Sequence, residues 1–333
     1  MRRSRLTLLV EDLSALAAAA PETPTPILER CLARGRPLTH AATNADALRL
    51  ALFGVRDTAS GAAPVGALTA VADGLAQAGD GRHWLRVDPV TLTADMTRVF
   101  MTAHGLADAD EAERAELRAC VADTLTEAGH ALLHGHPERW LLALEAAPPF
   151  TFMRLDDALG RDMAEALPNA PEARAWRRLL TDLQVALHNA EVNRRRRARG
   201  VREINAAWIW GGGRLPPGTP DAAFQCVVSD HPVSRGLAAL AGTAVQPEAE
   251  CEAALALGGE LAWDWQPGAA TARAALARLE RQVAALAGEV ARGCLALTLV
   301  DGGGRGWRVD RAALHRFWRR PRPLRDHFPA DTA

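Results

Sequence analysis

The richest group of anion-binding side chains lies between residues 193 and 213. Four consecutive arginines, Arg194–Arg197, precede an apolar stretch that ends in the glycine run Gly211–Gly213. Guanidinium groups pair with phosphate or carboxylate, and glycines that follow a strand can present backbone N–H groups to an anion. The pattern is compatible with a small-anion site, a nucleic-acid patch, or a solvated helix face with internal ion pairs. The formal net charge of −1 argues against nucleic acid and anionic membranes as partners of the whole molecule.

A second candidate cluster consists of His130, His134 and His136. On a helix, His130 and His134 would share one face and, with His136 just beyond, could hold a zinc ion with an open fourth position. The alternative is a helix that ends near Gly135, where a histidine interacts favourably with the helix dipole. Both interpretations predict a helix that runs into this segment, and the second, which we favour, involves no metal.

Basic and aromatic residues also alternate near the C-terminus, in the segment Arg316–Arg325. Such a segment could bind a partner or nucleic acid through its arginines. We favour the alternative, a solvated tail in which Phe317 and Trp318 pack on the core.

Other signatures of catalysis and cofactor binding are missing from the sequence. It has no GxSxG, no HExxH, no paired-carboxylate pattern, and no Lys-Ser/Thr after the glycine run. Its five cysteines are far apart and form no CxxC pair, which argues against a disulfide framework and favours a reducing compartment. The apolar run Leu6–Val10 is too short for a signal peptide, and no stretch reaches the ~20 apolar residues of a membrane span. We therefore expect a cytoplasmic protein without a cofactor.

The spacing of apolar residues predicts strands that alternate with helices. Short apolar or alternating runs predict strands at 6–10, 83–92, 140–144, 205–210, 226–229, 261–265 and 294–300, with 307–309 pairing to the last of them. Helical periodicity predicts helices at 27–34, 45–53, 64–77, 110–133, 173–189, 233–241 and 271–291. This alternation is typical of an α/β fold with a mostly parallel sheet flanked by helices.

Length and composition indicate two domains. The chain has 333 residues, about twice the ~150 residues typical of one domain, and its 24% charged and 48% hydrophobic residues are ordinary for a globular protein. The stretch 93–195 is richer in helices than its flanks. We predict that it is an inserted α+β domain, and that 1–92 and 196–333 together form the core.

One segment, 187–213, carries a motif whose matching residues occur in the order Asn193, Arg194, Gly200, Asn205, Trp208, Trp210, Gly211 and Gly213. Shorter matching segments lie in a consistent order at 6–13, 25–35, 46–57, 83–92, 157–170 and 233–245. Together they resemble the archaeal-type, cofactor-independent phosphoglycerate mutases. Segments 83–89 and 208–213 also resemble a proteobacterial group of RpfE-type regulatory proteins.

The resemblance implies an alkaline-phosphatase-like core with an inserted domain, and a reaction that moves a phosphoryl group through a phosphoserine with two divalent metals. This sequence departs from that machinery. Ala45 stands where the family has its nucleophilic serine, and only a shift of the local alignment would let Thr43 replace it. Asp12, Asp264 and Asp301 stand where metal-binding aspartates are expected, but the histidines of those motifs are missing.

These departures predict a catalytically degenerate bacterial member of the group, with a regulatory or binding role and without catalytic or metal-binding residues. The partner would be a small anionic ligand or a protein. The remnant anion site would consist of Asn193, Arg194, Asn205, Gly211, Gly213 and Arg235. The two asparagines could instead brace the junction between helix and strand. Two other functions stay open: an active metal-dependent mutase or phosphatase with a rearranged site, and a nucleic-acid-associated accessory protein.

Overall fold

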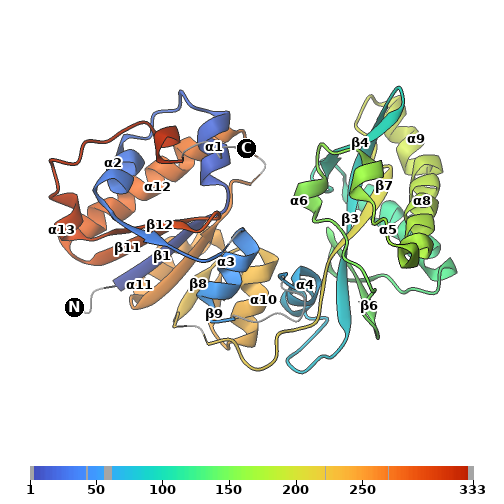
Figure 1. Ribbon diagram of the computed structural model, residues 1–333, viewed down its shortest axis with the longest axis horizontal. Coiled ribbons are helices and arrows are strands. Elements are labelled where there is room, and N and C mark those ends of the chain that lie inside the picture. The colour runs from blue at the N-terminus through green and yellow to red at the C-terminus, as the bar shows by residue number, and fades with distance from the viewer. Residues whose placement is uncertain (1–3, 43, 56–61, 222, 269, 329–333) are drawn as a thin grey trace. The chain divides into compact units, whose positions relative to one another are not determined.

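The computed structural model describes residues 4–42, 44–55, 62–221, 223–268 and 270–328 (Figure 1). Contacts divide the chain into two compact units, a first unit of residues 1–56 and 219–333 and a second unit of residues 57–218. Each unit has its own sheet. No helix in the described ranges is long and apolar enough to cross a membrane.

The first unit is built on a seven-stranded sheet. Its parallel part follows the spatial order β11 (Leu295–Asp301), β1 (Ser4–Val10), β10 (Glu260–Trp265), β8 (Cys226–Val228) and β9 (Ala244–Gln246). Beyond β11, the sheet is extended by two further strands in antiparallel pairing, β12 (Arg305–Val309) and then β2 (Arg36–Thr39). The predicted mixed α/β fold with a mostly parallel sheet is thus confirmed, as is the pairing of 307–309 with the preceding strand.

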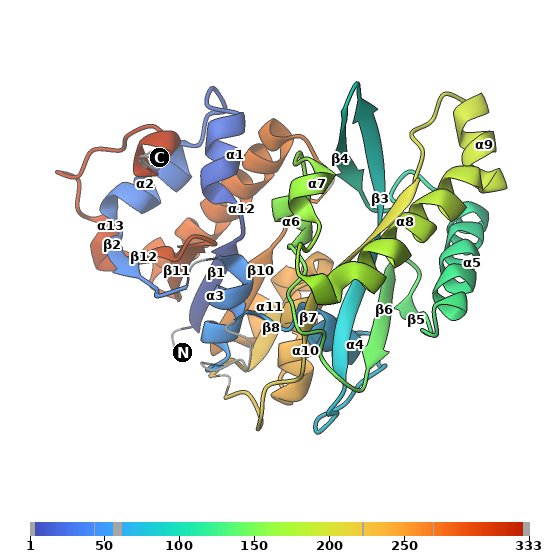
Figure 2. The same ribbon diagram turned by 45° about the vertical axis from the view of Figure 1, so that its right-hand side comes forward.

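Helices cover both faces of this sheet (Figures 1 and 2). The helices on one face are α1 (Leu13–Ala19), α2 (Pro26–Arg34) and α12 (Ala272–Arg292), and those on the other are α3 (Ala45–Leu52) and α10 (Pro232–Leu240). Side chains of a strand alternate between faces. Leu8 of β1 accordingly joins the core under α12, whereas Leu9 packs with Leu48 of α3. Both faces of β1 are buried, which explains its unbroken apolar run.

The long helix α12 shows why sequence patterns predicted these elements. Thr271 caps its first turn by accepting a hydrogen bond from the Ala274 N–H, and Gly293 ends it in the left-handed conformation, with φ at 80°. The apolar residues that recur between these ends at spacings of three and four are all buried: Leu276, Leu279, Val283, Leu286 and Val290. Local capping and the core therefore favour the same helix.

The second unit contains a five-stranded sheet in which every pairing is antiparallel. Its strands are β3 (His83–Asp95), β4 (Arg98–His104), β5 (Leu133–His136), β6 (Arg139–Leu144) and β7 (Ala206–Gly213). The main helices are α4 (Val65–Ala72) on one face, and α5 (Glu111–Glu127), α8 (Arg174–Asn189) and α9 (Glu191–Ala198) on the other (Figure 2). Short helices follow β6 at Leu155–Ala158 and Met163–Ala166.

The boundaries of the units differ from the predicted domain boundaries. β3 and β7, assigned by sequence to the core segments 1–92 and 196–333, pair with each other, with Val87 opposite Ile209. Because β3 also pairs with β4 and β6, both strands belong to the second unit. Helix-rich composition marked only the middle of this unit, because most of β3 and all of β7 lie outside 93–195.

Candidate functional site

Carboxylates gather at the carboxyl edge of the parallel sheet in the first unit. Glu11 follows β1 directly, Asp264 lies near the end of β10, and Asp301 ends β11. The three strands are parallel neighbours, so their carboxyl ends meet at one edge, which is the usual position of sites in open α/β sheets. Asp264 and Asp301 are both buried. Burying an ionised carboxylate is costly unless it is paired, so each needs a partner.

Arg49 of α3 is the partner of two of these carboxylates, Glu11 and Asp264, and also of Asp46 on its own helix. Its guanidinium meets Asp264 in a two-pronged contact, with Nε 2.9 Å from Oδ2 and Nη2 3.0 Å from Oδ1. Nη2 also donates to Glu11 Oε2 at 2.9 Å, and Nη1 donates to Asp46 Oδ1 at 2.9 Å. Only 1% of Arg49 is exposed. We call Arg49, Glu11, Asp46 and Asp264 the Arg49 cluster.

Local structure fixes the direction of the Arg49 side chain. The Asn44 side chain caps α3 by accepting a hydrogen bond from the Ala47 N–H, so the helix starts at Ala45. Asp46 and Arg49 are then three residues apart and lie on one helical face. That face points at the sheet edge.

Further hydrogen bonds hold the Asp264 carboxylate. Ser234 Oγ donates to Oδ2 at 2.6 Å, Ser229 Oγ lies 3.3 Å from the same oxygen, and Gln266 Nε2 donates to Oδ1 at 3.0 Å. Burial is the largest single influence and raises the pKa of Asp264, but the charge of Arg49 together with neighbouring groups and the hydrogen bonds from Arg49 and Ser234 outweighs it, so the pKa is lowered. The charges of Asp264 and Glu11 likewise outweigh burial and raise the pKa of Arg49 well above its ordinary value. Arg49 therefore stays charged.

The Arg49 cluster holds more negative than positive charge. Three carboxylates face one guanidinium, which leaves a formal excess of two negative charges. All three nitrogens of the guanidinium donate to these carboxylates, so the cation is directed inward. The guanidinium therefore offsets part of the charge of its own acids instead of presenting a positive charge to an anionic ligand.

Asp301 lies at the same edge but has different partners. Its carboxylate accepts hydrogen bonds from the backbone N–H groups of Gly303 at 3.2 Å and Ser14 at 3.4 Å. Burial raises the pKa of Asp301, and these two backbone contacts oppose the rise without cancelling it. Two aspartates at the same edge of the sheet thus have pKa values displaced in opposite directions.

Ala45, the first residue of α3, lies at this edge beside Gly302, the residue that follows β11. A Cβ atom added at Gly302 would stand 2.0 Å from the Glu11 carbonyl oxygen and 3.2 Å from the Ala45 Cβ. The position at which the resemblance implies a serine nucleophile is therefore at the sheet edge, and it carries a methyl group. Thr43, the alternative nucleophile, lies outside the described residues.

His231 is a further ionisable group beside the cluster. It precedes α10, and its backbone N–H donates to Ser229 Oγ at 2.9 Å. Burial lowers the pKa of His231, and the charge of Arg49 lowers it further against the opposing effect of Asp264. Its Nδ1 atom is buried and has no hydrogen-bond partner among the described residues. The imidazole is therefore neutral near pH 7.

The residues at this edge do not fit the two-metal site that the resemblance implies. The carboxylates of Glu11, Asp46 and Asp264 are already bonded to Arg49, whose positive charge occupies the place a cation would take among them. Within the described ranges, no group of three or more His, Cys, Asp or Glu side chains is arranged to hold a metal ion.

The histidine cluster in the second unit differs from its predicted form. α5 ends at Glu127, and β5 carries both His134 and His136, so the prediction of a shared helical face was wrong. Gly129, in the left-handed conformation, follows the end of the helix. His130 stacks on Trp176 with ring centroids 5.1 Å apart. His136 uses Nδ1 to accept the Glu138 N–H.

The structure gives several of the predicted anion-site residues internal contacts. The Asn193 side chain is fully buried, donates to the Leu187 and Ile204 carbonyls, and accepts the Ile204 N–H. Asn205 likewise bonds both backbone groups of Leu92. Arg194 is exposed and paired with Glu191. These contacts favour the bracing role for the two asparagines.

The remaining predicted residues are dispersed. Gly211 adopts a φ of 67°, and Gly213 packs so closely on Pro64 that a Cβ atom would stand 2.4 Å from its Cβ. These glycines therefore allow α4 to approach β7. Arg235 belongs to the first unit, where it donates to the Ser229 carbonyl at 3.3 Å.

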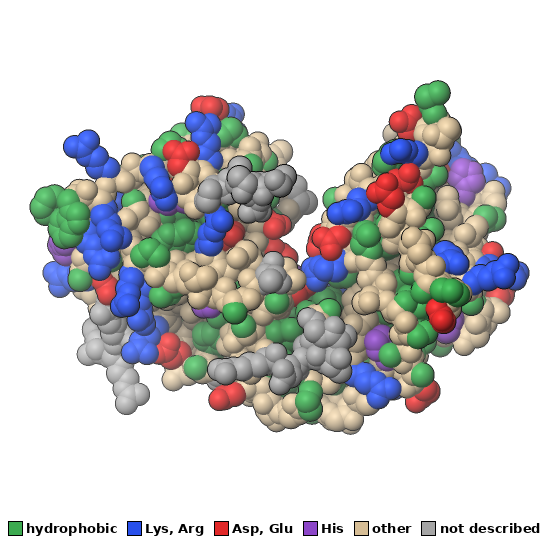
Figure 3. All heavy atoms as spheres, in the orientation of Figure 1, with side chains coloured by type: hydrophobic (Ala, Val, Ile, Leu, Met, Phe, Trp, Pro, Cys, Tyr) green, Lys and Arg blue, Asp and Glu red, His purple; other side chains and the backbone are tan. Residues whose placement is uncertain are grey.

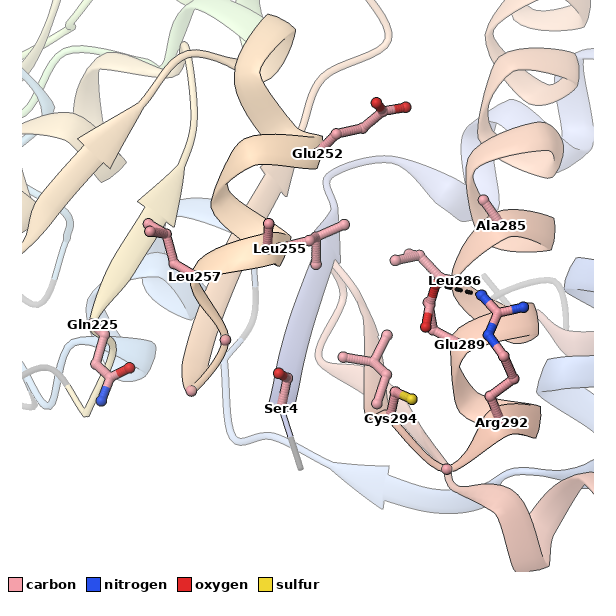
Figure 4. A pocket seen from close by; sticks show the side chains of 15 residues that line it. Ser4, Gln225, Glu252, Leu255, Leu257, Ala285, Leu286, Glu289, Arg292 and Cys294 are labelled. Atoms are coloured by element: carbon pink, nitrogen blue, oxygen red, sulfur yellow. Dashed lines mark hydrogen bonds and ion pairs between the residues drawn. The ribbon is translucent and has the colours of Figure 1, made fainter. Parts of the chain in front are cut away.

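A cavity of about 910 Å³ opens at the other end of the first unit's sheet, between α11 (Cys251–Leu257) and α12 (Figure 4). Leu255 and Leu286 project into it from the two helices. Glu289 and Arg292 at its side form an ion pair with each other. The cavity is thus an apolar surface, whereas the groups that could do chemistry lie at the carboxyl edge.

Sequence reasoning found Ala45, Asp264 and Asp301 through the resemblance but missed the residues that organise them. Arg49, Glu11, Ser234 and His231 come from distant parts of the chain, and only the sheet brings them together. The one local signal was the spacing of Asp46 and Arg49 on a predicted helix.

Comparison with solved structures identifies proteins of similar fold. The PH0037 protein from Pyrococcus horikoshii matches with a TM-score of 0.54 and 15% sequence identity, over 93% of this chain and 88% of that one. A cofactor-independent phosphoglycerate mutase from Thermoplasma acidophilum matches with a TM-score of 0.44 and 15% identity, over 92% and 89% of the two chains. No protein-family model and no curated protein matches the sequence. The chain therefore shares its fold with the PH0037 protein.

Proposed function

We propose that this chain is a catalytically degenerate phosphoglycerate mutase-like protein with an alkaline-phosphatase-like core, and that it acts by binding rather than by phosphoryl transfer. The observation that carries the proposal is the Arg49 cluster. A single buried guanidinium satisfies Glu11, Asp46 and Asp264 at the sheet edge where the resemblance implies metal ions. An internal cation of this kind balances charge but offers no open coordination position to a substrate.

The missing nucleophile supports the same conclusion. Phosphoryl transfer through a covalent intermediate needs an oxygen that can attack phosphorus. Ala45 offers only a methyl group at that position, in close contact with the Gly302 backbone. The neighbouring Asn44 side chain is engaged in capping α3.

Electrostatics at the edge also oppose a phosphorylated substrate. A phosphate monoester would approach a cluster with an excess of carboxylates, whose one guanidinium is fully engaged. Enzymes of phosphoryl transfer instead direct cations at the transferred group. The binding role therefore falls to other surfaces, and a protein partner or a small anionic ligand is the class we infer.

Phosphorus NMR tests the catalytic part of the proposal. The purified chain is incubated with 3-phosphoglycerate and Mn²⁺, Mg²⁺ or Zn²⁺, and the spectra are followed for 2-phosphoglycerate and free phosphate. We expect neither product. The variant Ala45→Ser is a matched control, and we expect it to stay inactive because Arg49 still occupies the acidic cluster. Metal-dependent turnover of the unmodified chain that Asp264→Asn or Asp12→Ala abolishes would overturn the proposal.

The anion site predicted from sequence supplies a test of the binding role. Inorganic phosphate is titrated against the chain while its melting temperature is followed. Stabilisation that disappears in Arg194→Ala would assign the anion contact to Arg194. Equal stabilisation in both proteins would remove Arg194 from the site and leave its pair with Glu191 as its role.

A further inference from the structure

Two aromatic side chains stand exposed near the C-terminus. Phe317 is 77% exposed and Trp318 67%, and their rings meet edge to face with centroids 5.3 Å apart. The prediction that they pack on the core was therefore wrong. The segment follows the four-residue helix α13 (Arg311–Leu314), which is too short to fold the next residues back. Large exposed aromatic groups mark interaction surfaces.

Arginines from two strands and this segment lie near the end of α2. Arg316 Nη1 donates to the Arg34 carbonyl and Arg319 Nη1 to the Gly35 carbonyl, both at 3.2 Å, which holds the segment against the end of α2. The next residue, Arg36 of β2, lies directly opposite Arg308 of β12. Figure 3 shows blue side chains gathered on this part of the first unit, around α13.

These guanidinium groups lack acidic partners. Within the described ranges, no ion pair to a carboxylate is formed by the members of what we call the C-terminal arginine surface: Arg36, Arg308, Arg311, Arg316, Arg319, Arg320 and Arg322. Like charges on directly opposed residues, such as Arg36 and Arg308, destabilise a sheet unless something neutralises them. An anionic partner would supply that neutralisation.

The other arginine run in the chain shows the contrast. Arg194 pairs with Glu191, Arg195 with Glu116, and Arg197 with Glu203. That run is therefore already neutralised by the protein itself, and the sequence alone could not distinguish it from the C-terminal one.

We propose that the C-terminal arginine surface binds single-stranded nucleic acid. Guanidinium groups pair with successive phosphates, and exposed aromatic rings stack with unpaired bases. The surface offers both groups side by side, with Phe317 and Trp318 between Arg316 and Arg319. An anionic membrane would require the apolar face of a longer helix, and α13 spans four residues. The near-zero net charge of the chain does not oppose a local patch of this kind.

Fluorescence anisotropy of a labelled oligouridylate of about 20 nucleotides tests the proposal. We expect binding at low salt that weakens as salt rises. Arg320→Gln with Arg322→Gln should reduce the slope of log affinity against log salt by about 0.7 for each phosphate that the variant no longer neutralises. Phe317→Ala with Trp318→Ala should weaken binding at least about fivefold, because stacking contributes about 1–3 kcal/mol per base. All four side chains are exposed, so circular dichroism should show an unchanged fold.

A matched control removes two arginines from the paired run, Arg195→Gln with Arg197→Gln, whose partners are Glu116 and Glu203. We expect this variant to bind like the unmodified chain. No binding at low salt, or an equal loss in the control and in the Arg320/Arg322 variant, would overturn the proposal. Retention on phosphatidylglycerol vesicles without oligonucleotide binding would also overturn it, in favour of a membrane surface. None of these outcomes depends on the Arg49 cluster, so the proposed function is tested separately.

Discussion

Each unit of the chain buries an arginine at the centre of an acidic network, and the two networks differ in charge. Arg49 in the first unit and Arg196 in the second are 1% and 0% exposed. Arg196 pairs with Glu113 and Asp108, and the same two acids also pair with Arg199 and Arg202 respectively. Three guanidinium groups thus share two carboxylates there, whereas one guanidinium serves three carboxylates around Arg49.

The difference separates a balanced structural network from a cluster with excess negative charge. Around Arg196, each acid has two cations, and the network ties α9 to the start of α5 and the loop before it. The excess of negative charge around Arg49 has no such structural advantage, since carboxylates that share one cation still repel one another. Such departures from a balanced core are expected at functional sites. We therefore expect these carboxylates to attract a cation when Arg49 is removed.

The largest expected effect follows from removing the Arg49 charge. Arg49→Met keeps much of the volume but removes the guanidinium shared by the buried Asp46 and Asp264 and the partly exposed Glu11, so we expect the free energy of unfolding to fall by about 3–5 kcal/mol. Urea denaturation, monitored by circular dichroism, measures this decrease in the free energy of unfolding. A decrease below about 1 kcal/mol would show that solvent or neighbouring groups already neutralise the acids.

Divalent cations should partly rescue that variant. The freed oxygens of Glu11, Asp46 and Asp264 are ligands that Mn²⁺ and Mg²⁺ prefer. At a free concentration about 100 times the dissociation constant, binding would restore about 2.7 kcal/mol. We expect Mn²⁺ to raise the melting temperature of Arg49→Met and to leave the unmodified chain unchanged. Equal shifts in both proteins would contradict the idea that Arg49 replaces a cation.

The corresponding change in the second unit should be milder. Arg196→Met leaves Glu113 paired with Arg199 and Asp108 paired with Arg202. The free energy of unfolding should therefore fall by about 1–3 kcal/mol, mainly because hydrogen bonds of the buried guanidinium are removed, and Mn²⁺ should not rescue it. A decrease equal to that of Arg49→Met in the same urea experiment would remove the distinction between the two networks.

The sequence predicted most of the helices and strands that surround the two arginine networks, but not the charge pairs within them. The apolar stripe of α12 and the runs of β1, β10 and β11 are local patterns, and these elements formed close to their predicted positions. Charge pairing is not local. An arginine-rich segment is neutralised at Arg194–Arg197 and open near the C-terminus, because only the first meets acids brought from other parts of the fold.

The prediction that His130 and His134 share a helical face was wrong for a similar reason. An i, i+4 spacing has meaning only if the helix continues, and α5 stops at Glu127. The predicted domain boundaries differ from those of the two units because strand pairing, rather than helix content, decides which residues form a unit. Of the acids in the Arg49 cluster, sequence reasoning assigned a role only to Asp264, and the cation that they share becomes apparent only in the folded sheet that brings them together.

The smallest expected effect concerns the two aspartates at the sheet edge, whose pKa values move in opposite directions. The pKa of Asp301 is raised, chiefly by burial, so its ionised form destabilises the folded state above that pKa, and the penalty fades as pH falls toward the unfolded value near ~3.9. For Asp264 the pKa is lowered, chiefly by Arg49 acting against burial. Its stabilisation is therefore present above about pH 3.9 and is lost as pH falls through the folded value.

We expect Asp301→Asn to raise the free energy of unfolding at pH 7 by up to about 1 kcal/mol, because the amide is neutral and keeps one acceptor for the Gly303 or Ser14 N–H. The gain should disappear near pH 4, where the carboxyl group of the unmodified chain is itself protonated. Asp264→Asn should instead destabilise the chain at pH 7 and flatten its loss of stability in acid. Urea denaturation at pH 7 and pH 4 checks both signs, and a gain from Asp301→Asn that is equal at the two pH values would show that it does not arise from titration.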